Sequence, residues 1–343
     1  MRLKNTYLSK RRNFFRRQPD RNGCHRVPDI VTLTINPAID IFVNVGRVEP
    51  TRKMRCSAPK RDPGGGGINV ARVAHRLGSN VAAIFPIGGT IGKLLQRLVQ
   101  REGIDSLVTP SHVETRENFT AYEETSGHQF RFVLPGSALH RAEWEACLDR
   151  LASLPSKPKF VVASGSVPPG VPDDFFARVV RHAKALGAKT VVDMAGAALK
   201  AVLAEGVTLI KPNLMELADL VGSALDNDRD RVTACRTLIA GGRTEAVALT
   251  LGEQGALLVT ATGAWRAQPM EIEVASTVGA GDSFLGGMVS ALAAGKTLEQ
   301  AFRVAVAAGS AAAMSPGTEL CSEVEVLRLL PEVKIKEVEA AVA

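Results

Sequence analysis

Short hydrophobic runs alternate with helical patterns through most of the chain. Residues 30–35 are all apolar or threonine, which is typical of a buried strand. From about residue 140 the alternation becomes regular, and it predicts strands near 160–164, 190–193, 207–211 and 246–250, with helical patterns between them. Because such alternation places strands in parallel with helices packed on both faces, we predict an α/β fold with a mostly parallel sheet.

Two segments depart from this pattern. Residues 41–59 and 117–134 alternate between apolar and polar positions, which is typical of strands with one exposed face. We therefore expect a small separate β-sheet, a lid over one edge of a body that spans residues 29–330. Residues 331–343 are expected to form a C-terminal tail.

Composition and charge narrow the class of protein. The chain has 343 residues, of which 45% are hydrophobic, and no apolar run is long enough to span a membrane. The net charge of +7 is uneven, because residues 1–28 hold nine Lys or Arg and a single acid, whereas the remainder has 33 basic and 34 acidic residues. Five scattered cysteines without metal-binding spacing fit reduced thiols in a cytoplasmic protein.

The basic segment 1–28 is expected to be a disordered extension. A transit peptide, or a tail that binds nucleic acid or a membrane, are the alternatives. The nearly neutral body shows no helix-turn-helix or RNA-binding motif, so we expect no nucleic-acid partner for it.

A glycine-rich stretch at residues 276–287 runs directly into a predicted helix. Several of its backbone N–H groups would point at one place, where the helix dipole favours a phosphate. Asp282, in the first helical turn, can accept a proton from an alcohol that attacks the phosphate. The alternative is an ordinary N-capping aspartate after a flexible loop.

Four consecutive glycines at residues 64–67 precede another predicted helix. Without side chains they let a ligand touch the backbone, and Asn69, one turn later, can bond sugar hydroxyls. A plain flexible loop is the alternative.

Two further loops lie at the carboxyl ends of predicted strands, where open α/β sheets bind ligands. In the first, Asn213 and Glu216 are three residues apart, so both can face a Mg²⁺ ion, although a helix cap has the same spacing. In the second, at residues 250–255, glycines bracket a loop that could hold a nucleotide or form a hairpin turn.

In this order, the four motifs resemble the PfkB/ribokinase family of carbohydrate kinases. Residues 64–69 resemble its first signature, and the G-A-G-D core at 279–282 resembles its second. The similarity covers about residues 29–330 and implies a ribokinase-like fold. Within the family, the chain is most similar to the type II bacterial 6-phosphofructokinases, through residues 33–40, 53–56, 130–136 and 164–170. Since the similar region begins near Val27, we expect the native chain to start downstream of Met1.

The resemblance implies ATP-dependent phosphorylation of fructose 6-phosphate at the C1 hydroxyl, with Mg²⁺ as cofactor. Tagatose 6-phosphate and fructose 1-phosphate are alternative substrates, because the sequence near Asp40 and Arg116 does not distinguish them. A nucleic-acid-binding protein acting through the basic segment is a third hypothesis.

The resemblance also implies residue roles. Asp282 would be the catalytic base, and the backbone of Gly279, Ala280 and Gly281 would stabilise the transferring phosphoryl group. The expected sugar-phosphate ligands are Asp40, Gly65, Gly66, Asn69, Arg55, Lys53, Arg116 and Ser166. The expected nucleotide-binding residues are Lys211, Asn213, Thr250, Gly252, Gly255 and Ser310, with Glu216 organising Mg²⁺. From the residues alone, Arg116 could equally be a solvated lid charge.

Two features concern regulation and assembly. The resemblance implies a potassium site that uses Ser276 and Val278, although Glu319 stands where the family has a basic residue. Apolar alternating lid strands need their other face covered, so we expect the lid to pair with a second copy and form a homodimer.

Overall fold

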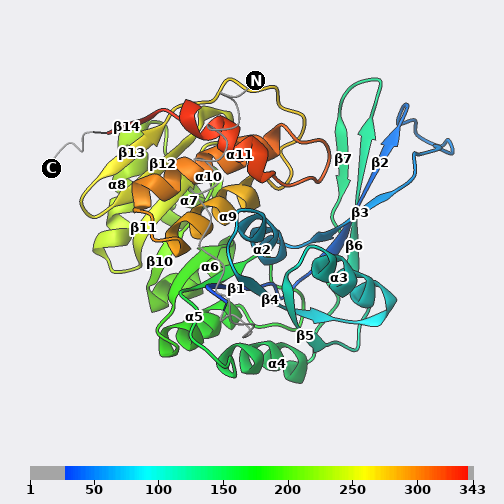
Figure 1. Cartoon of the computed structure of the whole chain (residues 1–343), viewed down its shortest axis with the longest axis horizontal. Helices are drawn as coiled ribbons and strands as arrows, with labels where there is room; N and C mark the ends of the chain where they lie inside the picture. The colour runs from blue at the N-terminus through cyan, green and yellow to red at the C-terminus, as the bar shows by residue number, and fades with distance from the viewer. Residues whose placement is uncertain (1–27, 339–343) are drawn as a thin grey trace, which may run out of the picture.

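The computed structural model describes residues 28–338, so the basic segment 1–28 lies almost entirely outside the described residues. Its main sheet has ten strands, of which the seven from β11 to β5 run parallel (Figure 1). In spatial order these strands are β14 (Ile335–Glu337), β13 (Ala264–Ala267), β12 (Ala256–Thr260), β11 (Thr244–Thr250), β10 (Val207–Ile210), β9 (Lys189–Asp193), β8 (Phe160–Ser164), β1 (Ile30–Leu33), β4 (Val81–Ile87) and β5 (Asp105–Pro110). The prediction of a mostly parallel sheet is confirmed.

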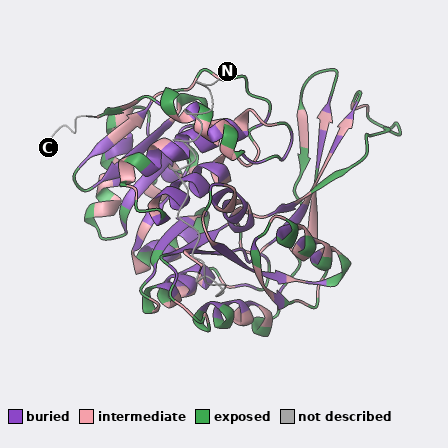
Figure 2. Ribbon diagram, viewed as in Figure 1, coloured by how far each residue is buried: buried purple, intermediate pink, exposed green. Residues whose placement is uncertain are grey.

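Helices cover both faces of this sheet, and each face has its own hydrophobic core (Figure 2). Successive strand residues alternate between the two cores: Ile30 packs into one and Val31 into the other. One layer consists of α2 (Gly66–Arg76), α3 (Gly89–Arg101), α9 (Ala280–Ala293), α10 (Leu298–Ala313) and α11 (Glu323–Leu329). The other consists of α4 (Arg141–Ala152), α5 (Phe175–Ala185), α6 (Gly196–Glu205), α7 (Leu214–Val221) and α8 (Asp228–Ala240).

A second, four-stranded sheet projects from the body at the right of Figure 1, and we call it the lid. Its strands, in order, are β3 (Lys60–Gly64), β2 (Ala38–Val45), β6 (Arg116–Glu123) and β7 (Gln129–Phe132). The expectation of strands throughout 41–59 is wrong for residues 46–59, which form an irregular connection with a single bridge between Val45 and Cys56. Pro50 and Pro59 lack the N–H groups that a continuous strand pair would need.

The C-terminal end differs from the expected tail. Residues 335–337 form β14, which pairs antiparallel with β13 and closes one edge of the main sheet. Apolar and charged residues alternate in this short segment, which suits an edge strand. The segment is too short for the alternation to predict a strand from the sequence. Within residues 28–338, no helix is long and apolar enough to cross a membrane.

Candidate active site

The candidate site lies at the carboxyl ends of the parallel strands, beneath the lid. A cavity of about 500 Å³ opens there, within the size range of small-molecule sites. Four carboxylates line it: Asp173 before α5, Asp193 at the end of β9, Glu216 in α7 and Asp282 in α9. Ser166, from the loop after β8, and Gly66, at the start of α2, complete the wall nearest the lid.

Asp282 lies in the first turn of α9, as the glycine-rich motif predicts. Gly279 caps this helix at φ +75°, a left-handed conformation that favours glycine, and the turn brings the first N–H groups of the helix toward the cavity. Asn69 Nδ2 donates a hydrogen bond of 2.9 Å to Asp282 Oδ2. Burial, together with the charge of Asp193, raises the pKa of Asp282 to about 7, which suits a general base near neutral pH.

Lys211 supplies the cation of the site. Its side chain is buried, and Nζ lies 3.1 Å from Asp193 Oδ1. Burial alone would lower the pKa of Lys211, but Asp193, Asp282 and Glu216 together raise it, so the ammonium stays charged. A Cβ placed on Gly281 would lie 3.5 Å from this Nζ, so the cation stands beside the glycine-rich turn. Together, the backbone N–H groups of the turn and the ammonium of Lys211 can bind phosphate oxygens.

Asp40 lies on lid strand β2 and is held by the neighbouring lid strand β6. Asn118 Nδ2, on β6, donates 2.8 Å to Asp40 Oδ1. Burial raises the pKa of Asp40, against the hydrogen bond from Asn118 and the nearby charges of Arg131 and Arg116. Gly65 caps α2, and a Cβ on Gly66 would come within 2.3 Å of Ser164 Oγ, so only glycine permits this approach of α2 to β8.

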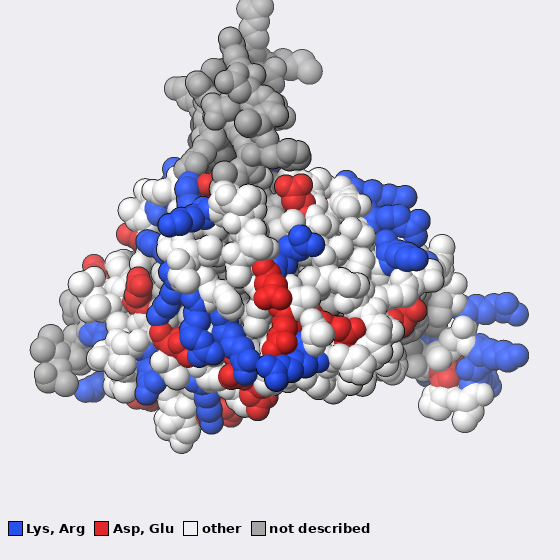
Figure 3. Space-filling model, turned by 90° about the horizontal axis from the view of Figure 1, so that it is seen from below, with Lys and Arg blue, Asp and Glu red and all other residues white. Residues whose placement is uncertain are grey.

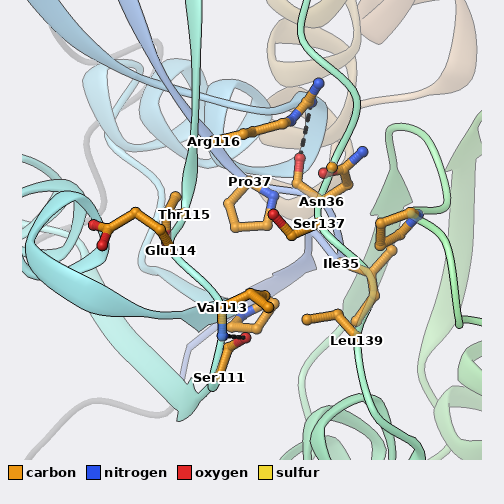
Figure 4. A pocket seen from close by; sticks show the side chains of 13 residues that line it. Ile35, Asn36, Pro37, Ser111, Val113, Glu114, Thr115, Arg116, Ser137 and Leu139 are labelled. Atoms are coloured by element: carbon orange, nitrogen blue, oxygen red, sulfur yellow. Dashed lines mark hydrogen bonds between the residues drawn. The ribbon is translucent and has the colours of Figure 1, made fainter.

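Arg116 and Asn36 line a second pocket (Figure 4), and Ser166 joins them through a hydrogen bond with Asn36. Arg116 Nη2 donates 3.0 Å to the carbonyl of Asn36, and Nη1 donates 2.7 Å to the carbonyl of Leu134. Asn36 Nδ2 in turn donates 3.0 Å to Ser166 Oγ. Burial lowers the pKa of Arg116 from its usual high value, which identifies it as a partly desolvated cation rather than a freely solvated charge.

Lys53 and Arg55 do not join this group. Both lie exposed on the irregular connection between β2 and β3, and within residues 28–338 no hydrogen bond or ion pair links them to Arg116 or Ser166. Basic side chains gather on this projecting end of the molecule (Figure 3). The structure of a single chain therefore does not bring together all four expected phosphate ligands.

The expected nucleotide-binding residues follow the adjacent strand ends. Asn213 and Glu216 form a capping box, in which Glu216 N donates 2.9 Å to Asn213 Oδ1 and Asn213 N donates 2.8 Å to Glu216 Oε2. Thr250 N donates 3.0 Å to the carbonyl of Pro212, which ties the second loop to the first. Gly252 and Gly255 bound a single 3₁₀ turn, and Ser310 lies half-buried in α10.

The same residues bear on Mg²⁺. Carboxylate oxygens of Asp193, Glu216 and Asp282 face one cavity, and hard oxygen donors are what Mg²⁺ prefers. Among the described residues, no three His, Cys, Asp or Glu side chains form a ready metal cage. A site that holds Mg²⁺ through one or two carboxylates and the phosphates of a nucleotide fits this arrangement.

Ser276 and Val278 lie where the lid meets the body. Ser276 Oγ donates 2.7 Å to the carbonyl of Gly317, and Val278 N donates 3.2 Å to Ser276 Oγ. Gln129 Oε1, on lid strand β7, lies 3.2 Å from the same hydroxyl. Glu319 is ion-paired with Lys60 of β3, so the acid that departs from the family pattern binds the lid.

Three residues of the site were not among those expected. Asp193 ends a predicted strand, and its position at the carboxyl end was the available signal. Asn36 stands between two predicted strands beside Pro37. Arg72 is a charge on the buried face of α2, and such a charge needs partners that only the folded chain reveals.

The chain matches the model of the pfkB family carbohydrate kinases over residues 32–325. It is 43% identical over 301 residues to the ATP-dependent 6-phosphofructokinase isozyme 2 of Mycobacterium tuberculosis, covering 88% of each chain. It is 40% identical over 294 residues to the isozyme 2 of Escherichia coli, covering 85% of this chain and 95% of that one.

Solved structures of the E. coli phosphofructokinase-2 are similar throughout. The complex with fructose-6-phosphate has a TM-score of 0.84 at 37% identity, and the complex with potassium has 0.85 at 38%; each match covers 89% of this chain and 99% of the other. The same protein has also been solved in a tetrameric inhibited form. Because the family model matches most of the chain and the relatives are similar along nearly its whole length, this protein belongs to the pfkB family of carbohydrate kinases.

Proposed function

We propose that this kinase transfers the γ-phosphoryl group of ATP to the C1 hydroxyl of fructose 6-phosphate. The observation that carries the proposal is the placement of Asp282, a carboxyl with a pKa of about 7, beside the helix N-terminus and facing the cavity. The names of the relatives, which are 6-phosphofructokinases at 43% and 40% identity, support this substrate.

In this mechanism, catalysis rests on positioning and charge. Asp282 accepts the proton of the attacking hydroxyl, and Asn69 holds the carboxylate in place. The N–H groups at the start of α9, together with Lys211, offset the negative charge that develops on the transferring group. Glu216 and Asp193 would hold Mg²⁺, which neutralises charge on the phosphates when it is bound. No covalent intermediate with the protein is required.

Arg116 is the proposed anchor for the sugar phosphate. Its two carbonyl acceptors, on Asn36 and Leu134, fix the guanidinium and leave Nε buried without a partner. A fixed guanidinium suits a phosphate dianion. Tagatose 6-phosphate and fructose 1-phosphate stay as alternative acceptors, since they differ in one stereocentre or in phosphate placement.

We also propose a homodimer formed through the lid. Phe119 and Phe132 face each other across β6 and β7, with ring centroids 6.2 Å apart and ring planes tilted by 43°, yet they are 37% and 56% exposed. Val133 and Leu134, which follow β7, are exposed apolar residues as well. A second lid would cover it, and pairing would give the exposed Lys53 and Arg55 a route to a phosphosugar that the single chain does not provide.

A potassium ion is the remaining proposed ligand. The loop that holds Ser276, Val278 and the carbonyl of Gly317 offers oxygen atoms in close proximity. The complex of the E. coli relative with potassium supports this assignment.

Replacing Asp282 by asparagine tests the central step. The variant keeps the shape of the side chain but cannot take a proton, so kcat should fall by about 100-fold or more while ATP still binds. Asp219→Asn, on the exposed side of α7, is the matched control and should keep wild-type turnover. Turnover like that of the wild type in Asp282→Asn would contradict the proposal.

A further inference from the structure

Arg72 is a buried cation one turn beyond Asn69 on α2. It is 3% exposed, and a charge at that depth requires several partners. Arg72 Nε donates 2.7 Å to Glu102 Oε1, and Nη1 donates 2.8 Å to the carbonyl of Pro63 on lid strand β3. Nη2 lies 3.7 Å from Asp62 Oδ1, also on β3. Arg72 therefore joins α2, the end of α3 and the lid.

The same guanidinium also reaches the side chain that holds the base. Arg72 Nη1 lies 3.4 Å from Asn69 Oδ1, a long hydrogen bond, while Asn69 Nδ2 donates to Asp282. The reversed amide would place its NH₂ group against the guanidinium and its oxygen against the carboxylate, and both contacts are repulsive. The positive charge of Arg72 thus selects the orientation in which Asn69 donates to Asp282.

From these contacts we infer that Arg72 is a positioning residue, which orients Asn69 toward Asp282 and connects the lid strand β3 to the catalytic base. The inference rests on the proposed role of Asp282. On the side of the lid, the series of contacts continues through Asp62. Its Oδ2 accepts a hydrogen bond of 3.0 Å from Thr318 Oγ1, in the loop before α11. Arg72 therefore contacts both strand β3 and the amide that touches the base.

The orientation of Asn69 affects the pKa of Asp282. The hydrogen bond from Asn69 lowers the pKa of this carboxyl against the effects of burial, Asp193 and Asp40, while the charge of Lys211 also lowers it. If Asn69 loses its fixed orientation, that pKa should rise, and the deficit in turnover should be larger at pH 7 than at pH 9. A purely structural role for Arg72 would produce no such recovery with pH.

The test compares Arg72→Lys with Arg76→Lys. A lysine at 72 keeps the charge beside Glu102 but cannot serve Glu102, Pro63 and Asn69 together. Arg76 lies one turn along the same helix and pairs with the same Glu102, at 3.1 Å, but does not touch Asn69. It is the matched control.

For Arg72→Lys, we expect kcat at pH 7 to fall roughly tenfold and to recover partly by pH 9, with the KM for ATP nearly unchanged. For Arg76→Lys, we expect the pH profile of the wild type. Thermal unfolding of both variants reports any common loss of stability. A profile for Arg72→Lys that matches Arg76→Lys would overturn the inference, provided that Asp282→Asn is inactive; an active Asp282→Asn would instead contradict the proposed function.

Discussion

The surroundings of Asp282 shift the pKa of its carboxyl in two opposite directions. Its carboxyl is desolvated beside Asp193, which favours the protonated form, while Asn69 and Lys211 favour the charged form. The outcome, a pKa near 7, leaves both forms populated at neutral pH. A base with this property accepts a proton from an alcohol and releases it again without a large energetic penalty.

This balance predicts the pH dependence of the reaction. Protonated Asp282 cannot accept a proton, so kcat/KM for fructose 6-phosphate should be low in acid and rise with an apparent pKa of about 7. Initial rates from pH 5.5 to 9 with Mg-ATP measure it. In the residual activity of Asp282→Asn this limb should be lost, and a wild-type profile that is flat between pH 5.5 and 8 would contradict the assignment.

At the residue scale, site residues that belong to a sequence motif were predictable. Site residues whose role depends on burial in the folded chain were not. The positions of Asp282 and Asn69 follow from glycines that precede a helix. The structure brings them within 2.9 Å of each other although they are 213 residues apart. The role of Arg72 depends on Glu102 and Pro63, which come from two other elements. No sequence pattern near Arg72 indicates those partners.

At the scale of elements, the site depends on how closely α2 approaches α9. Gly286 on α9 faces Val73 on α2, and a Cβ at this glycine would lie 2.6 Å from Val73 Cβ and 3.1 Å from the carbonyl of Val70. These two helices carry Asn69 and Asp282. The spacing between the two site residues is thus set by a contact that excludes even a methyl group.

Gly286→Ala should push the two helices apart. We expect the free energy of unfolding to fall by about 1–3 kcal/mol, because overpacking forces the backbone to shift, and kcat to fall with it. Urea unfolding and initial rates measure both. The control is Gly46→Ala, where nothing lies within 4 Å of the added carbon and the change should stay within about 0.5 kcal/mol. Equal stability of the two variants would contradict this prediction, because it would show that α2 and α9 can separate enough to hold the methyl group.

Elements were predictable where the alternation of strands and helices is regular. The strands expected near 160–164, 190–193, 207–211 and 246–250 begin and end within two residues of those bounds. Strands β5 and β14 were missed because they are edge strands, with few apolar residues and only one neighbour each. The connection at residues 46–59 looked like a strand because Met54 and Cys56 alternate, but its prolines prevent continuous pairing.

At the scale of the whole molecule, the lid is the surface that a single chain leaves incomplete. Phe119 and Phe132 are exposed on its strands, and Lys53 and Arg55 are exposed on the connection between β2 and β3. Lid strands also contact the loops at Ser276 and Glu319. Pairing of two lids would therefore affect both the phosphate ligands and the proposed potassium loop.

Phe132→Asp tests this assembly. A carboxylate on the exposed apolar face should oppose its burial against a second lid, so the variant should be a monomer at concentrations where the wild type is a dimer. Sedimentation velocity measures the state, and kcat/KM for fructose 6-phosphate should fall with dissociation. A wild-type protein that is monomeric at micromolar concentration, or a variant that remains dimeric and fully active, would contradict pairing through this face.

The most direct test of the whole account is the specificity of the wild-type enzyme. With saturating Mg-ATP, kcat/KM is measured for fructose 6-phosphate, tagatose 6-phosphate and fructose 1-phosphate. Arg116 is the proposed anchor for the phosphate and Asp282 the proposed base at the other end of the site, which disfavours fructose 1-phosphate, and the similarity to 6-phosphofructokinases favours fructose over tagatose. We therefore predict the highest value for fructose 6-phosphate, by about tenfold or more. A higher value for fructose 1-phosphate or tagatose 6-phosphate, or no turnover of any of the three, would contradict it.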